Sequence, residues 1–128
     1  MSTDVITVFI NEMKNNVNGF IAVAVVEIES GLSFGSYSNK ADFDVELAAA
    51  YNIEVVKAKL KAVESLGLVG NEIEDILITL TTQIHILDIS PNKKYMIYLS
   101  VDKSKANLGM TRGVLRKYKV ELEEGLKD

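Results

Sequence analysis

The sequence has 128 residues, of which 48% are hydrophobic and 25% charged, with a net charge of −4, one Pro and no Cys. This composition is that of an ordered globular protein, and its length suits one domain spanning residues 1–128. The excess of acidic residues makes nucleic acid an unfavourable main partner. Without Cys, a disulfide framework, a thiol nucleophile and a thiolate metal site are all excluded.

The charge at the start of the chain and the length of its apolar runs indicate where in the cell the protein is expected. The start of the chain carries Asp4 and lacks the basic segment that begins a signal peptide. The longest apolar run, residues 20–26, is far too short to cross a bilayer, which takes about 20 residues. We therefore expect a cytoplasmic protein that does not insert into a membrane.

The first third of the sequence predicts a helix followed by a β-hairpin. Apolar residues recur at helical spacing over residues 4–16. Residues 20–28 form an almost continuous apolar run, typical of a strand that is covered on both faces at the centre of a sheet. Residues 29–31 predict a tight turn, and residues 32–38, which are rich in Ser and Gly, then suit an edge strand.

Residues 42–66 predict one long helix around which the rest of the chain is organised. Three carboxylates, those of Asp42, Asp44 and Glu46, favour the positive end of its dipole. Gly67 is suited to end it in the left-handed conformation. At about 1.5 Å per residue such a helix is about 37 Å long, which is long for a domain of this size.

This helix carries two apolar stripes when its residues are placed at intervals of about 100°. The first stripe comprises Val45, Ala49, Val56, Leu60 and Val63. The second stripe comprises Leu47, Tyr51, Val55, Ala58, Ala62 and Leu66. A helix that covers a sheet needs only one stripe. The second stripe therefore indicates either a partner protein or cover by the first and last helices of the same chain.

The second half of the sequence predicts three strands and a closing helix. Strands are expected at residues 74–80, 83–89 and 95–102, separated by short turns. Residues 104–124 then predict a helix, in which close packing on the sheet or an irregular start would explain Gly109 and Gly113. The resulting order of helix, two strands, long helix, three strands and helix predicts an α+β fold with helices on both faces of an antiparallel sheet.

Three stretches in this layout resemble those of the roadblock / dynein light chain family. They are residues 19–26 (GFIAVAVV) ahead of the hairpin, residues 46–50 (ELAAA) in the long helix, and residues 99–109 (LSVDKSKANLG), where a strand gives way to a helix. The likeness covers residues 4–122, and it rests on the order and spacing of motifs that are unspecific alone. The sequence departs from the family at residues 29–31, where an Asp-Gly pair is common.

This resemblance implies a five-stranded antiparallel sheet of order 2-1-5-4-3. The long helix would lie on one face and the two terminal helices on the other, as in roadblock- and profilin-like folds. It also implies an obligate homodimer, in which the third strands of two copies pair into one continuous sheet and the long helices pack together. Relatives of this kind scaffold or regulate small Ras-like GTPases in signalling, polarity or motility, or act as dynein light chains.

The residues themselves also favour a dimer. Residues 74–81 are strongly β-forming and contain no Pro or Lys, so a free edge here would invite aggregation unless a second copy covers it. Alternatively, this strand lies inside the sheet and needs no partner. The predicted dimer interface comprises Ile76, Ile78 and Leu80 on the strand and Leu47, Tyr51, Val55 and Ala58 on the long helix.

The residue pattern indicates binding rather than catalysis. Glu54, Lys57 and Lys61, on the polar face of the long helix, are the expected contacts for the GTPase. The sequence has no phosphate-binding Gly-rich motif, nucleophile elbow or Ca²⁺ loop pattern, so we expect no enzyme activity, cofactor or metal. His85, the only histidine, is expected to be structural. The alternative function is a sensory module that binds a small molecule between the sheet and the long helix.

The last predicted helix has a basic flank. Residues 103–120 include six basic residues and no acidic one, with Lys105, Arg112, Arg116 and Lys119 on one side. Such a stripe either recruits an acidic partner or a lipid surface, or is a solvated flank. Arg112 and Arg116 are the only arginines, and neither is placed as an arginine finger. We therefore expect a regulator that positions the GTPase's own catalytic groups.

Overall fold

The computed structural model describes residues 3–127, over which the chain forms three helices and five strands. In chain order these are α1 (Thr3–Asn16), β1 (Phe20–Glu27), β2 (Ser33–Ser38), α2 (Val45–Ser65), β3 (Asp75–Thr79), β4 (Gln83–Ile89), β5 (Tyr95–Asp102) and α3 (Leu108–Leu126). The strands form one antiparallel sheet of order β2-β1-β5-β4-β3. This confirms the predicted α+β class and strand order.

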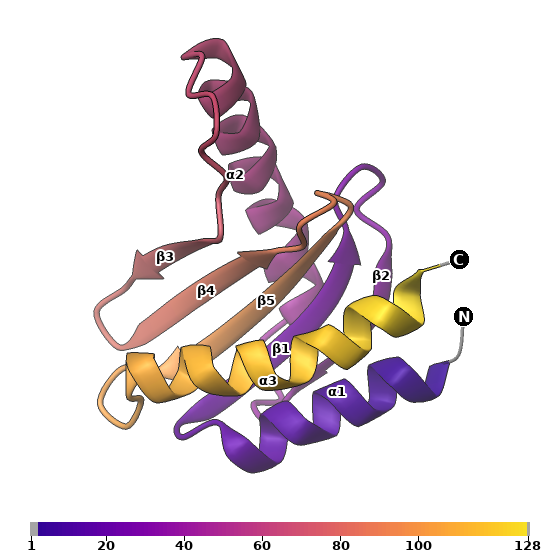
Figure 1. Cartoon of the computed structure of the whole chain (residues 1–128). Coiled ribbons are helices and arrows are strands. Elements are labelled where there is room, and N and C mark those ends of the chain that lie inside the picture. The colour runs from indigo at the N-terminus through magenta and orange to yellow at the C-terminus, as the bar shows by residue number, and fades with distance from the viewer. Residues whose placement is uncertain (1–2, 128) are drawn as a thin grey trace.

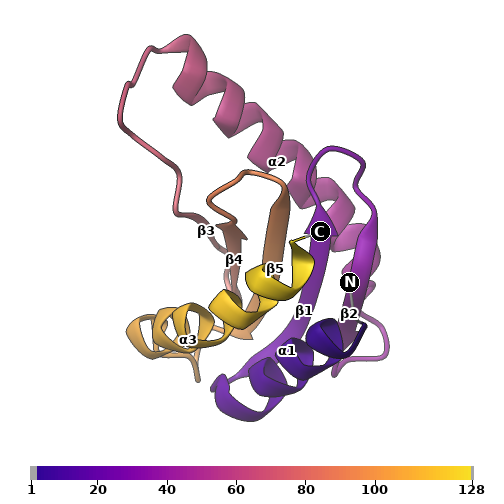
Figure 2. The same cartoon turned by 45° about the vertical axis from the view of Figure 1, so that its right-hand side comes forward.

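The sheet separates two layers of helices. α2 lies on one face, and α1 and α3 lie side by side on the other (Figures 1 and 2). Along the inner strand β1, Val23 and Val25 pack beneath α1 and α3, whereas Ala22 and Ala24 face α2. Small alanine side chains on that face allow the backbone of α2 to approach the sheet closely. The apolar run of β1 is therefore buried on both faces, as predicted.

Side-chain caps decide where the longer helices begin. Asp44 caps α2 by accepting a hydrogen bond from the Leu47 N–H at 3.0 Å. Asn107 caps α3 in the same way, by accepting from the Met110 N–H at 3.0 Å. The predicted starts at residues 42 and 104 are therefore too early. Gly67 follows α2 with a positive φ of 63°, as predicted.

α2 runs across β2, β1 and β5, and its C-terminal half then projects beyond the sheet (Figures 1 and 2). Val45, Ala49 and Val56 of the first predicted stripe are buried. Ile53, which that prediction omitted, is buried with them. The last two residues of the stripe, Leu60 and Val63, are only half-buried because they lie where the helix leaves the sheet, and Leu60 still packs against the core.

The close approach of backbones occurs between α1 and α3, at Gly125. A Cβ atom at this position would lie 2.5 Å from Val5 Cγ2, so only glycine fits without a shift of the helices. At Gly113 a Cβ atom would meet nothing within 4 Å. Close packing on the sheet therefore does not explain the glycine inside α3.

Candidate protein-binding surface

The second apolar stripe of α2 faces solvent. Leu47, Tyr51 and Val55 are 53%, 70% and 37% exposed, and Ala58 is exposed as well. α1 and α3 lie on the opposite face of the sheet (Figure 2). The alternative in which they cover this stripe is therefore wrong.

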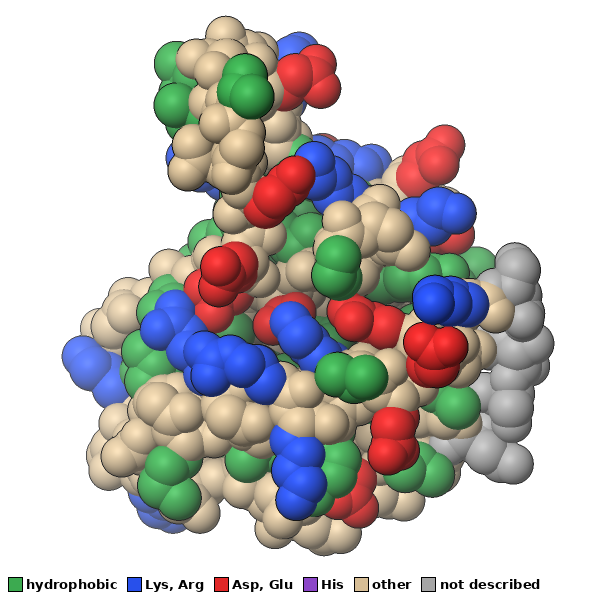
Figure 3. All heavy atoms as spheres, viewed as in Figure 1, with side chains coloured by type: hydrophobic (Ala, Val, Ile, Leu, Met, Phe, Trp, Pro, Cys, Tyr) green, Lys and Arg blue, Asp and Glu red, His purple; other side chains and the backbone are tan. Residues whose placement is uncertain are grey.

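The projecting end of α2 adds to this apolar surface. Leu66, Leu68 and Val69 are 71%, 45% and 94% exposed, and hydrophobic side chains are visible on this end at the top of Figure 3. Helical periodicity could not place Leu68 and Val69 on the surface, because they follow the helix in a turn shaped by Gly67 and Gly70. Several large exposed apolar side chains along one helix and its end indicate an interaction site.

β3 forms one edge of the sheet, so the alternative that places this strand inside the sheet is wrong. Ile76 and Ile78 are half-buried and face the α2 side, where they pack at the margin of the core beside Leu60 and Ile73. Leu80 lies just beyond the strand and is 44% exposed. The predicted strand residues and the exposed stripe of α2 thus lie on the same side of the molecule.

The backbone of β3 shows which of its groups are free. The Leu80 N–H donates to the Gln83 carbonyl at 2.8 Å, across the turn into β4. Because the backbone groups of alternate residues point to the same side of a strand, the even-numbered residues of β3 bond to β4. The N–H and C=O groups of Asp75, Leu77 and Thr79 therefore point away from the sheet, available to another strand.

A small polar cluster lies on the α2 side of β4 and β5. His85 Nε2 donates to Gln83 Oε1 at 2.9 Å, and this oxygen also accepts from Ser100 Oγ at 3.0 Å. The His85 ring stands edge-on to the ring of Tyr98, with the ring centroids 5.2 Å apart. Burial lowers the pKa of His85 and raises the pKa of Tyr98 to about 12. Burial thus disfavours the charged form of His85, whose polar partners the sequence did not reveal.

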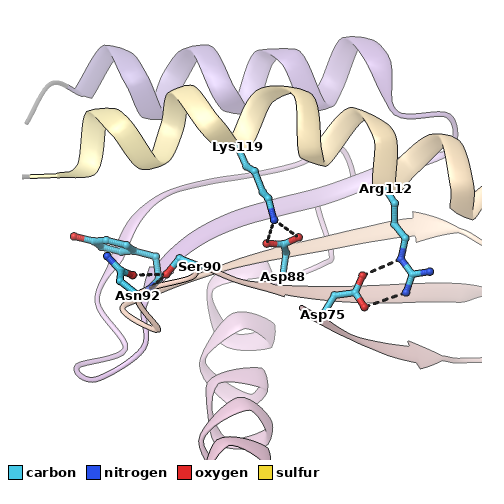
Figure 4. Close-up of polar contacts among 7 residues, drawn as sticks. Asp75, Asp88, Ser90, Asn92, Arg112 and Lys119 are labelled. Atoms are coloured by element: carbon cyan, nitrogen blue, oxygen red, sulfur yellow. Dashed lines mark hydrogen bonds and ion pairs between the residues drawn. The ribbon is translucent and has the colours of Figure 1, made fainter. Parts of the chain in front are cut away.

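Two ion pairs tie α3 to the outer strands of the sheet (Figure 4). Arg112 Nε and Nη2 donate to the two carboxylate oxygens of Asp75 at 2.8 and 3.0 Å. Lys119 Nζ lies 3.2 Å from Oδ1 of the buried Asp88, whose pKa is raised by burial and lowered, to a smaller extent, by this lysine. Half of the predicted basic stripe therefore holds α3 in place rather than forming a free cationic surface.

The predicted partner contacts Glu54, Lys57 and Lys61 are all exposed on α2. Lys57 Nζ also donates to the Glu29 carbonyl at 3.2 Å and so connects the helix to the β1–β2 turn. The structure therefore leaves all three side chains within reach of a partner, with Lys57 partly oriented by the chain itself.

Residues 3–127 contain neither a cluster of metal ligands nor a membrane span. Within that range no three His, Asp or Glu side chains lie together as metal ligands would. No helix there combines the length and the apolar character needed to span a bilayer.

Comparison with known proteins identifies the architecture. The sequence matches no protein-family model and no curated protein. The structure superimposes on Myxococcus xanthus MglB with a TM-score of 0.82 at 17% identity, covering 99% of this chain and 94% of that one. It superimposes on a Roadblock/LC7 domain from Streptomyces avermitilis with a TM-score of 0.74 at 9% identity, covering 93% and 96% of the two chains. The chain has the roadblock/LC7 fold.

A third roadblock/LC7-like structure agrees with this assignment. The gliding protein MglB of Thermus thermophilus superimposes with a TM-score of 0.76 at 11% identity, covering 94% of this chain and 87% of that one. The fold implied by the sequence resemblance is thereby confirmed. In this roadblock/LC7 fold, the exposed stripe of α2 and the open edge of β3 both lack a partner among the residues that the structure describes for a single copy.

Proposed function

We propose that this chain is a non-enzymatic homodimer that scaffolds or regulates a small Ras-like GTPase. The observation that carries the proposal is the pairing, on one side of a roadblock/LC7 fold, of a solvent-exposed apolar stripe on α2 with an open strand edge at β3. A second copy of the chain would cover both. The cytoplasmic location and the single domain over residues 1–128 stay predictions.

The backbone of β3 favours one pairing register for the dimer. A two-fold axis at Leu77 places this residue opposite itself and Asp75 opposite Thr79 of the second copy. All the outward N–H and C=O groups of these residues are then bonded, with two hydrogen bonds for each of three facing pairs. On the α2 side, Ile76 faces Ile78 of the second copy, and each such β-branched pair contributes about 0.2–1 kcal/mol.

The exposed stripe of α2 provides the second part of this interface. Leu47, Tyr51 and Val55 are held on a regular helix, so little conformational entropy is lost when a second helix packs against them. Full burial of an aliphatic side chain of this size stabilises by about 1.5–3 kcal/mol. A single 14.1 kDa species in light scattering at high concentration would contradict the dimer.

The GTPase part of the proposal is supported by the sequence resemblance and by the shared fold. The guanidinium of Arg112 is engaged by Asp75 in a two-pronged ion pair, which argues against its use as an arginine finger. We therefore assign the dimer a positioning role, with Glu54, Lys57 and Lys61 as contacts. A single copy of α2 presents these residues on its polar side, next to the apolar stripe.

The test is calorimetric titration of the purified chain with a small GTPase encoded beside it, loaded in turn with GDP and with a non-hydrolysable GTP analogue. We expect affinities that differ by about tenfold between the two nucleotide states. Replacing Lys57 and Lys61 by Glu should remove the binding. Lys14→Glu, on the opposite face of the sheet, is the matched control. Equal affinity for both states, or no binding, would contradict the proposal.

The sensory alternative requires an apolar pocket between the sheet and α2. The apolar hollow lined by Val5, Val8 and Leu122 lies instead between α1 and α3, on the other face of the sheet. The geometry therefore supports the dimeric regulator over the sensory module.

A further inference from the structure

An apolar hollow of about 150 Å³ lies between α1 and α3, and the proposed dimer and GTPase contacts make no use of it. Phe9 and Leu122, each only 2% exposed, belong to both this hollow and the core beneath it. Val5 and Val8 of α1 line one side, and Tyr118 of α3 lines the other. The hollow is thus open to solvent on one side and closed by the buried side chains of Phe9 and Leu122 on the other.

The way in which α1 packs beside α3 creates this hollow. α1 and α3 run in opposite directions (Figure 1), and Val5 of α1 packs against the backbone of Gly125 in α3. One turn further along, Val8 faces outward and is 51% exposed, so it does not fill the space between the helices. Buried residues anchor both helices on the sheet on either side of the hollow.

The rim of the hollow is acidic. Glu12 of α1 and Glu121 of α3 both line it, and within residues 3–127 neither carboxylate forms an ion pair. Figure 3 shows acidic and apolar side chains next to each other over these two helices. Lys117 lies 5.3 Å from the centre of the Tyr118 ring and offsets this charge only in part. An anionic lipid surface would be repelled here.

We propose that this hollow binds a short basic segment of a partner protein. The segment inserts one Leu or Phe side chain between α1 and α3 and places Lys or Arg beside Glu12 and Glu121. A cavity of about 150 Å³ with apolar walls accepts a group of the size of benzene, which matches these side chains. The site lies on the opposite face of the sheet from the proposed dimer contacts and does not depend on them.

The experiment uses a short capped peptide in which one Leu is flanked by Lys on both sides. It is titrated into the methyl-labelled protein, and the methyl resonances of Val5, Val8 and Leu122 are followed by NMR. We expect saturable shifts at these methyl groups. A peptide with Ala in place of Leu should not shift them, and a peptide with Glu in place of Lys should bind about tenfold more weakly.

Matched variants complete the test. Val8→Arg should abolish binding, whereas Val120→Arg, at a residue that is 61% exposed on α3 but outside the hollow, should leave it unchanged. Replacing both Glu12 and Glu121 by Gln should weaken binding about threefold to tenfold. Equal binding of the Leu and Ala peptides, or no methyl shift at all, would overturn the proposal. A monomeric variant should still bind the peptide, which separates this result from the fate of the proposed dimer.

Discussion

The outward N–H of Thr79 offers a direct test of edge pairing between two copies. Thr79→Pro removes this N–H, which points away from β4, and leaves the hydrogen bonds between β3 and β4 in place. Thr79 is exposed, so the substitution removes little packing within one copy. Thr79→Lys is the matched control, because it changes the same side chain but keeps the N–H.

The expected effect follows from the symmetry of the register. Each copy loses the donor that bonds to the Asp75 carbonyl of the other, so the dimer loses two hydrogen bonds. At about 0.5–1.5 kcal/mol each, the dimer is weakened by about 1–3 kcal/mol, which is about 5-fold to 150-fold in the dissociation constant. Thr79→Lys instead places a cation opposite Asp75 of the second copy and should not weaken the dimer.

Sedimentation equilibrium over a range of concentrations measures the dissociation constants of the three proteins. Urea unfolding of the dilute samples checks that each copy retains its fold. If Thr79→Pro dimerises as tightly as Thr79→Lys and the unmodified chain, β3 is not the pairing edge, and the register centred on Leu77 is wrong.

Four other substitutions test the structure. Tyr51→Lys should weaken the dimer more than about tenfold in sedimentation while changing monomer stability by less than about 0.5 kcal/mol, because the side chain is 70% exposed in one copy. Gly125→Ala should lower the free energy of unfolding by about 1 kcal/mol, since its clash with Val5 exceeds the gain in helix propensity. Gly113→Ala, where a Cβ meets nothing, should raise it by about 1 kcal/mol in the same urea titration. Burial lowers the pKa of His85, so the unfolded chain takes up the proton first as the pH falls below about 6.5, and stability should fall there. His85→Gln should flatten this part of the stability–pH curve, and an unchanged curve would contradict the assignment.

The sequence alone determined which segments form helices and strands and which faces of them are apolar. The two stripes of α2 could be predicted because helical spacing places residues on a face whatever the helix contacts. The inner position of β1 in the sheet followed from its unbroken apolar run, and the left-handed conformation of Gly67 from its place after the helix. These are local properties, set by the backbone geometry of neighbouring residues.

The tertiary structure alone decided what each face meets. It showed that α2 leaves the sheet after Val56, so that the far end of the buried stripe is only partly covered. It paired Arg112 with Asp75, which are 37 positions apart, and brought Val5 against Gly125 to form the hollow between α1 and α3. Contacts between distant segments depend on the path of the whole backbone, so the spacing of residues within one segment cannot predict them.

A single copy leaves apolar side chains exposed on α2 and unpaired backbone amides along the edge of β3. Helical periodicity predicted that α2 has a second apolar face, which is exposed in the structure. The strand order showed that β3 is an unpaired edge of the sheet.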